Sequence, residues 1–313
     1  MEALLFCFPT IFAEKIKKII EDSGIHPDRV YNADQSGFKY ELTGERSLAK
    51  KGVKEVIKIA QSKNATTHSF TILPIVSMGG FLQEKVLVTF QETGGKFGPQ
   101  VQQTMIKPEN LVFEATTSGI MNKKGLKTFI QDVFGRVASS EDLNLLLVDH
   151  WGPFTDKVSI NDWMPDGKEL IVENIPKNCT RFAQPFDVFG FRPVKDYGRR
   201  FVSTMKMKHQ DIMMFQRNNQ SKFISMLMNQ FRSPRYIGLW QYAWYKAGYR
   251  SNYIPFESPV KFAFMFGFDN CCECATVANI RCAWCRKKFC LLHFFIDNPN
   301  YNLKYHYCSQ YVN

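Results

Sequence analysis

The chain has 313 residues, 45% of them hydrophobic and 28 of them Phe, so it can fill a large core and global disorder is not expected. Its 40 Lys and Arg against 29 Asp and Glu leave a formal charge of +11, which favours a polyanionic partner, nucleic acid before an acidic membrane surface. No apolar run reaches the ~18 residues of a membrane span, and Glu2 stands where a secretory signal would be basic.

The first part of the chain is predicted to begin with a helix and to continue in strands. An amphipathic helix is expected to end near Gly24. Residues 30–38 follow as a first strand, which runs into a carboxylate and a Gly turn. Residues 68–77 and 81–90 are expected to pair as two strands, since the Met78-Gly79-Gly80 segment between them is typical of a hairpin turn.

Helical and strand patterns then alternate. Residues 122–137 have helical period, and residues 168–176 form a strand. Residues 143–150 contain a continuous apolar run that predicts a strand covered on both faces. A further helix is expected from Pro193, with an apolar stripe on one side and basic residues elsewhere.

This order of elements predicts an α/β fold. A strand, a hairpin, a helix, two more strands and a helix are compatible with an RNase H-like mixed sheet flanked by helices. We expect four regions: an N-terminal helix over residues 1–25 as a truncated remnant, a catalytic core over 26–230, an aromatic-rich helical extension over 231–268, and a small zinc-binding module over 269–313.

Three aspartates stand in settings that suit a metal-dependent nuclease. Asp34 and Asp149 end apolar strands, and Asp187 opens a predicted helix. Carboxylates are seldom buried unless they are paired or bind a cation, and two or three of them suffice to hold Mg²⁺. Taken singly, each has an ordinary alternative, because Asp is common in turns, at strand ends and as a helix N-cap.

The neighbours of these aspartates resemble the DDE superfamily endonucleases, in the pogo/Tigger branch of the mariner-type DNA transposases. The family has a strand followed by Asn-x-Asp-Glu-Thr-Gly, an apolar strand ending in Asp before a Gly/Pro loop, and a block Pro-x-Asn-x-Thr, Gln-Pro-x-Asp and Arg-Pro-x-Lys. The matching residues are Asn32-Ala33-Asp34-Gln35-Ser36-Gly37-Phe38; Leu145 to Val148, Asp149, Gly152 and Pro153; Pro176, Asn178, Thr180, Gln184, Pro185, Asp187, Arg192, Pro193 and Lys195; and, more weakly, Ser118-Gly119-Ile120-Met121.

The resemblance covers roughly residues 25 to 210 and implies a function. On it, Asp34, Asp149 and Asp187 are the catalytic, Mg²⁺- or Mn²⁺-binding triad of an endonuclease that hydrolyses DNA phosphodiesters and transfers strands. It implies double-stranded DNA as partner, a nuclear location, a homodimer as a candidate assembly, and no membrane partner. The alternative is a host-retained, non-catalytic DNA- or chromatin-binding protein derived from a transposase.

Basic residues directly follow the third aspartate. Arg192, Lys195, Arg199 and Arg200 are candidates for holding DNA phosphates next to the site, and a solvated helix face is the alternative for such a charge run. A second, weaker candidate is the group Lys50, Lys51 and Lys54.

Seven of the nine Cys lie between Cys271 and Cys308, at spacings that favour metal binding over disulfides. Cys-x-x-Cys spacing lets two sulfurs grip one tetrahedral Zn²⁺, and four such pairs are the stoichiometry of two sites. Alternating pairs are expected to share a metal in a cross-brace, and Cys272 is the alternative ligand to Cys271. The segment also resembles the Cys-rich C-terminal domain of some of these transposases. The predicted ligand pairs are Cys271/Cys274, Cys282/Cys285, Cys290/His293 and His306/Cys308.

Overall fold

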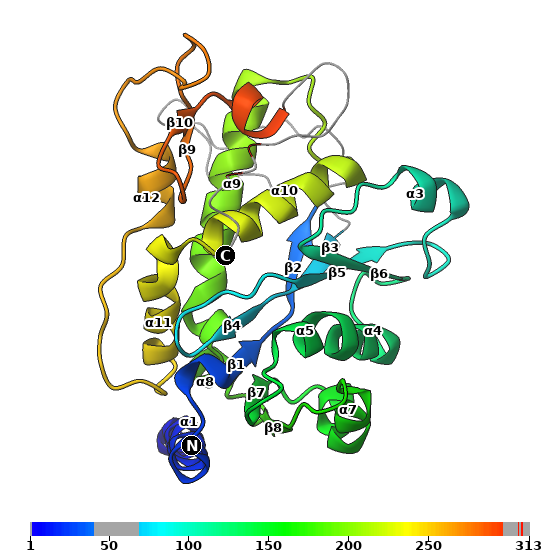
Figure 1. Ribbon diagram of the computed structural model, residues 1–313, viewed down its shortest axis with the longest axis vertical. Coiled ribbons are helices and arrows are strands. Elements are labelled where there is room, and N and C mark those ends of the chain that lie inside the picture. The colour runs from blue at the N-terminus through cyan, green and yellow to red at the C-terminus, as the bar shows by residue number, and fades with distance from the viewer. Residues whose placement is uncertain (1, 41–68, 297–305, 307, 309–313) are drawn as a thin grey trace.

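The structure is a computed structural model that describes residues 2–40, 69–296, 306 and 308 (Figure 1). The candidate basic group Lys50, Lys51 and Lys54 lies outside these residues. None of the helices in the described part is both long and apolar enough to cross a membrane.

The strands form two four-stranded sheets, and the chain passes from one sheet to the other at two short interruptions, between β1 and β2 and between β3 and β4. One sheet has the order β4-β1-β7-β8 and the other β2-β3-β5-β6. Only Asp34 and Gln35 separate β1 from β2, and only Pro74 separates β3 from β4; Pro has no N–H to offer the ladder. The strands are β1 (Val30–Ala33), β2 (Ser36–Lys39), β3 (Ser69–Leu73), β4 (Ile75–Ser77), β5 (Val86–Gln91), β6 (Leu111–Thr116), β7 (Asn144–Val148) and β8 (Leu170–Asn174).

The sheets are mixed in direction. β1 pairs antiparallel with β4 and parallel with β7, and β7 pairs parallel with β8. In the second sheet β3 is antiparallel to both β2 and β5, while β5 and β6 are parallel. The predicted hairpin is therefore confirmed as a pairing of β3 with β5, although regular strand begins at Val86 and residue Leu82 makes only an isolated bridge to Val76.

Helices cover both faces of the first sheet, which makes a three-layer arrangement. Leu145 and Leu147 of β7 face one hydrophobic cluster, and Leu146 and Val148 face the other. The prediction of a strand buried on both sides is thus confirmed. One face is covered by α4 (Lys123–Thr128), the π-helix η2 (Phe129–Phe134), α5 (Gly135–Val137), α6 (Gly152–Thr155) and α7 (Lys157–Trp163).

The opposite face carries the helices that follow β8. The chain passes through α8 (Thr180–Ala183) and the π-helix η3 (Phe186–Gly190) directly into α9 (Phe191–Lys208). The helix predicted from Pro193 therefore begins two residues earlier, because η3 already supplies helical backbone to Phe191. The other helices are α1 (Glu2–Ser23), η1 (Pro27–Arg29), α3 (Pro99–Thr104), α10 (Arg217–Phe231), η4 (Pro234–Tyr236), α11 (Ile237–Lys246) and α12 (Pro259–Phe264).

The Cys-rich segment packs on the far end of α9 and on α10 (Figure 1). It contains the short hairpin β9 (Ile280–Arg281) and β10 (Lys288–Phe289) and the π-helix η5 (Leu292–Ile296). The expected α/β class, an RNase H-like mixed sheet flanked by helices, is confirmed. The division into four regions at the predicted boundaries stays a prediction.

Candidate active site and metal-binding clusters

Asp34 and Asp149 lie side by side because of the register between two parallel strands. Asn32 of β1 is the register partner of Leu147 in β7, so continuing the ladder by two residues places Asp34 opposite Asp149. Each follows the last residue of its strand. Carboxyl ends of neighbouring parallel strands are where α/β sheets place their sites.

Asp187 is brought to the same place by a buried side chain, that of Asn32. Its Nδ2 donates to the Leu147 carbonyl oxygen (3.0 Å), and its Oδ1 accepts from the Phe186 backbone N–H (3.3 Å). Asn32 is 0% exposed. One amide therefore joins β1, β7 and the first residue of η3, so that Asp34 and Asp187 lie close enough for each carboxyl group to affect the pKa of the other.

All three carboxyl groups have a raised proton affinity. Burial, and then the charges of Asp187 and Asp149, raise the pKa of Asp34 well above 3.8. Burial also raises the pKa of Asp149 and of Asp187. Asp34 Oδ2 is buried without a hydrogen-bond partner among the described residues. A buried carboxylate with an unpartnered oxygen and two carboxylate neighbours fits a divalent cation, which would supply the missing contact.

The four basic candidates do not gather at one place. Lys195 is half-buried near the carboxyls: burial and Arg199 lower its pKa, while Asp187 and Asp34 oppose that shift. Arg199 is paired with Asp196 at 2.8 Å. Arg192 and Arg200 line two separate cavities, between α9 and the segments that flank α12. Of the predicted group, only Lys195 is in electrostatic contact with the aspartates.

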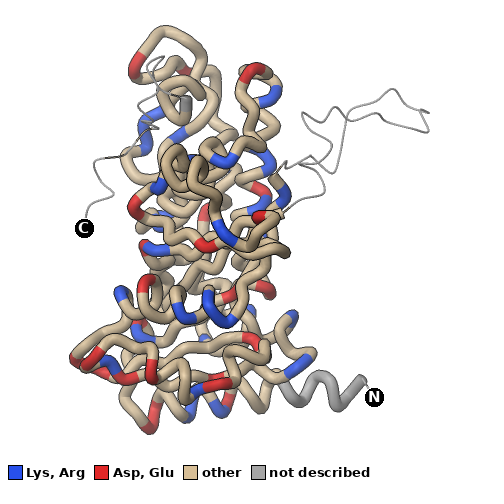
Figure 2. The backbone as a smooth tube through the Cα atoms, turned by 90° about the vertical axis from the view of Figure 1, so that its right-hand side faces the viewer, with Lys and Arg blue, Asp and Glu red and all other residues tan. Residues whose placement is uncertain are grey.

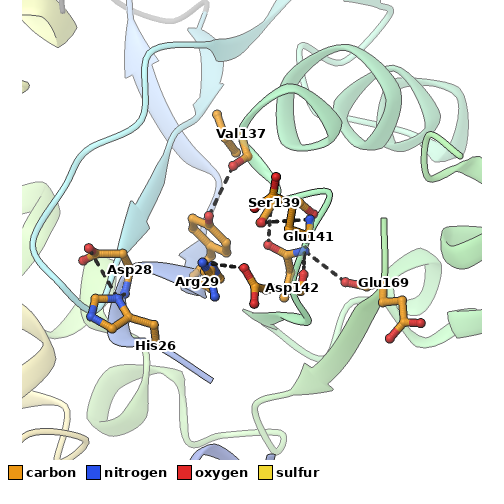
Figure 3. Close-up of polar contacts among 10 residues, drawn as sticks. His26, Asp28, Arg29, Val137, Ser139, Glu141, Asp142 and Glu169 are labelled. Carbon is orange, nitrogen blue, oxygen red and sulfur yellow. Dashed lines mark hydrogen bonds and ion pairs between the residues drawn. The ribbon is translucent and has the colours of Figure 1, made fainter. Parts of the chain in front are cut away.

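The far end of the same strands is fixed by polar contacts. Arg29 pairs with Asp142 at 2.5 Å, and the Tyr31 hydroxyl donates to the Val137 carbonyl (3.3 Å), which joins the start of β1 to the segment before β7 (Figure 3). The Asn144 amide donates to the carbonyls of Asp142 (3.0 Å) and Glu169 (3.1 Å). These contacts hold the register that sets Asp34 opposite Asp149 at the other end.

The eight predicted zinc ligands form two clusters of four. In each cluster one ligand atom per residue lies within 4.8 Å of the others. The first and third predicted pairs form one cluster, and the second and fourth pairs form the other, as a cross-brace requires. The clusters are Cys271, Cys274, Cys290 and His293, and Cys282, Cys285, His306 and Cys308.

The spacing of these atoms suits tetrahedral zinc. A Zn–S bond of about 2.3 Å gives ligand–ligand distances of roughly 3.8 Å. Cys274 Sγ lies 3.9 Å from Cys290 Sγ, and Cys285 Sγ lies 3.6 Å from His306 Nε2. The clusters could therefore hold a metal such as zinc. Cys272, the proposed substitute for Cys271, is exposed, is in neither cluster, and has its Sγ on Glu273 Oε1 at 3.6 Å.

Two residues that support these sites have no role predicted from the sequence. Asn32 stands in a predicted motif, but its contacts between helix and strand depend on the fold. Gln230 of α10 donates from Nε2 to Cys282 Sγ (3.6 Å) and accepts from the Ala283 N–H (2.7 Å). No sequence signal marks Gln230, because its partners lie about 50 residues away.

Solved structures with a similar arrangement are transposase–DNA complexes. The Mos1 transposase paired-end complex with left transposon end has a TM-score of 0.39 at 9% identity, over 77% of this chain and 61% of that chain. The Mos1 mariner paired end complex with Mn has a TM-score of 0.39 at 10% identity, over 78% and 63%. The chain thus spans less than two thirds of the length of these transposases. No curated protein matches the sequence.

The C-terminal part matches a known family over residues 244–308, a range that contains α12 and both Cys/His clusters. The pogo/Tigger branch is not resolved by this match and stays a prediction. The expected Cys-rich transposase C-terminal domain is confirmed, because residues 244–308 match the Tc5 transposase C-terminal domain.

Proposed function

We propose that the chain is the endonuclease core of a DNA transposase, which hydrolyses phosphodiesters in double-stranded DNA with Mg²⁺ or Mn²⁺ and transfers the freed strand. One observation carries this proposal. Three carboxyl groups from β1, β7 and η3 converge at the ends of two parallel strands, and one of them is buried with an unpartnered oxygen. Such a group is costly to keep in its charged form unless it binds a cation.

In this proposal Asp34, Asp149 and Asp187 would hold the divalent cations. Bound metal would supply an activated water and neutralise the leaving oxygen. Asn32 keeps the three carboxyls together through its two backbone contacts. Lys195, whose ammonium lies 5.6 Å from the ring centroids of both Phe38 and Phe191, offers a fixed positive charge to a phosphate beside the aspartates.

Nicking of supercoiled plasmid tests the proposal directly. Asp34→Asn or Asp149→Asn is expected to lower Mg²⁺-dependent nicking by ~100-fold or more, since metal stabilisation of the transition state amounts to several kcal/mol. Asp132→Asn, which changes an exposed carboxylate on η2, is the matched control and should nick like the wild type. Nicking by Asp34→Asn at the wild-type rate would refute the triad.

A metal titration separates the proposal from its alternative, a non-catalytic DNA- or chromatin-binding protein. Calorimetry with Mn²⁺ should show binding that Asp34→Asn abolishes and Asp132→Asn leaves intact. DNA binding without any carboxylate-dependent uptake of Mn²⁺ would favour the alternative. The proposal also includes zinc in the two Cys/His clusters, a nuclear location and a homodimer.

A further inference from the structure

A groove of about 350 Å³ lies between the second half of α9 and the segment after α12. Arg200, Thr204, Met207 and Lys208 form one wall, since residues four, seven and eight apart share a helix face. The opposite wall contains three Phe residues. The remaining lining residues are Phe264, Phe266, Gly267, Phe268, Val277, Ala278 and Asn279.

The charge of the groove is of one sign. Its lining contains two cationic residues and no acidic one. Arg200 and Lys208 are exposed and have no acidic partner within the described part of the chain. Elsewhere basic and acidic positions are interspersed, as the side of the molecule in Figure 2 shows. An unpaired basic wall is complementary to a chain of phosphates.

The aromatic wall is partly rigid and partly open. Phe264 packs edge-on against Tyr197, with ring centroids 4.9 Å apart, and Phe266 lies under Arg281 and Lys288 at 5.3 and 5.5 Å. Phe268, by contrast, is 103% exposed. A fully exposed aromatic ring beside cations can stack on a base of a single strand. In a duplex, the faces of the bases are covered by their neighbours in the stack.

The groove and Lys195 lie on the same helix, with the groove nearer the C-terminal end of α9. Figure 1 shows α9 running from the first sheet toward β9 and β10. Thr204 lies nine residues beyond Lys195 on α9, about 14 Å further along the helix and on its opposite side. A strand bound near Asp187 would therefore pass around α9 to reach the groove, a path longer than about four steps of 3.4 Å along a DNA strand.

We propose that this groove binds a single DNA strand, with Arg200 and Lys208 on its phosphates and Phe268 stacked on a base. The proposal deepens the nuclease function proposed above and rests on it for the origin of the strand. The first Cys/His cluster shapes the groove: Cys271 N–H donates to the Thr276 carbonyl, and Ala278 N–H to the Asp269 carbonyl, each at 2.8 Å. Metal on Cys271 and Cys274 would fix the loop between Phe268 and Val277.

Fluorescence anisotropy with a labelled twelve-nucleotide oligo-dT tests the groove, using the full chain with zinc retained and no Mg²⁺. Phe268→Ala should weaken binding about fivefold or more, as loss of one stacked base does. The double variant Arg200→Gln/Lys208→Gln should lower the slope of log affinity against log salt by about 1.4, or about 0.7 for each phosphate that is no longer neutralised. Phe268→Ala should leave that slope unchanged.

Matched controls are available on other surfaces. Phe81→Ala removes an aromatic ring that is 46% exposed, and Lys157→Gln removes an exposed cation on α7; both should bind oligo-dT like the wild type. The proposal is overturned if Phe268→Ala binds like Phe81→Ala, or if it loses as much affinity for a twelve-base-pair duplex. It is also overturned if Phe268→Ala changes only the sedimentation coefficient, which would make the groove a contact between copies.

The two proposals fail in different ways. Binding is measured without Mg²⁺ and so does not depend on cleavage. Unchanged oligo-dT binding in the groove variants, together with Asp34-dependent nicking, would reject the groove alone. Phe268-dependent binding without any nicking would support the groove and reject the nuclease.

Discussion

At the scale of single residues, the candidate active site depends on an amide as much as on its carboxylates. Asn32 is completely buried and bonds to two other segments of the chain. It stands two residues before Asp34 and is the register partner of Leu147, which stands two residues before Asp149. Its contact with the Phe186 N–H sets the position of the neighbouring Asp187. Three carboxyls from distant parts of the sequence therefore share one anchor.

Replacing Asn32 should lower both the free energy of unfolding and the affinity for metal, and the loss of metal affinity should exceed that caused by a substitution that is equally destabilising elsewhere. Asn32→Ala leaves the Phe186 N–H and the Leu147 carbonyl without this partner, which should cost about 1–3 kcal/mol in urea unfolding. Loss of a residue that orients ligands typically lowers metal affinity 10–100-fold, so Mn²⁺ binding by calorimetry should fall by at least about tenfold.

A buried amide elsewhere gives the control for this prediction. Asn110 is 5% exposed and bonds to the Ser225 carbonyl and to Asn229 Oδ1. Asn110→Ala should destabilise the protein similarly while keeping wild-type affinity for Mn²⁺. Equal Mn²⁺ affinity in Asn32→Ala and Asn110→Ala would show that Asn32 has only a structural role.

At the scale of elements, the sequence was most informative where the pattern is local. The apolar run of β7 and the stripe Val194, Tyr197, Phe201 and Met205 on α9 predicted strand and helix, and all of these side chains are buried. The break of the first strand at Asp34 and of the next at Pro74 was not predicted, because either residue can also sit inside one bent strand. Joining of the two sheets across these breaks depends on partners far along the chain.

Helix α10 shows why other elements could not be predicted. Its buried residues include Gln220, Lys222, Asn229 and Gln230, so it shows no clean apolar stripe. These polar side chains find their partners in tertiary structure: Gln220 Nε2 donates to the Tyr40 carbonyl at 2.6 Å, and Gln230 reaches Cys282. Periodicity detects burial only where burial is apolar.

Gln230 should affect only one of the two proposed zinc sites. Its N–H···S contact bears on Cys282, a ligand of the second cluster. Gln230→Met keeps the volume and removes both contacts, so one zinc should dissociate about 10–100 times faster, as for other residues that support a ligand. Stepwise zinc release to a coloured chelator measures this as one fast and one unchanged phase.

Gln220→Met on the same helix is the matched control. Gln220 is 2% exposed and bonds to the Tyr40 and Met214 carbonyls, far from the Cys/His clusters in sequence. Both zinc phases should remain as in the wild type. Acceleration of both phases by Gln230→Met would instead indicate general loosening of the C-terminal domain.

At the scale of the whole molecule, the three carboxyls of the candidate active site make the free energy of unfolding depend on pH and, in the proposed function, on a bound cation. Burial raises the pKa of Asp34, Asp149 and Asp187 above the ordinary value of 3.8. The folded chain therefore holds more protons than the unfolded chain from about that pH up to the raised values. Stability falls with rising pH wherever the folded state binds more protons.

Without Mg²⁺, the unfolding free energy of the wild type should therefore fall relative to that of Asp34→Asn as pH rises from 4 to 8. Comparing the two proteins cancels the contribution of groups whose pKa is shifted the other way. Asp156 is one such group, because its hydrogen bonds to Ser159 and Lys123 lower its pKa to about 2. Urea unfolding at several pH values, with zinc retained, measures the difference. Saturating Mg²⁺ should reverse it at pH 8, because the cation binds the deprotonated carboxylates of the folded chain. A difference that is independent of pH, or insensitive to Mg²⁺, would mean that the three carboxyls titrate as ordinary surface groups and do not form a metal site.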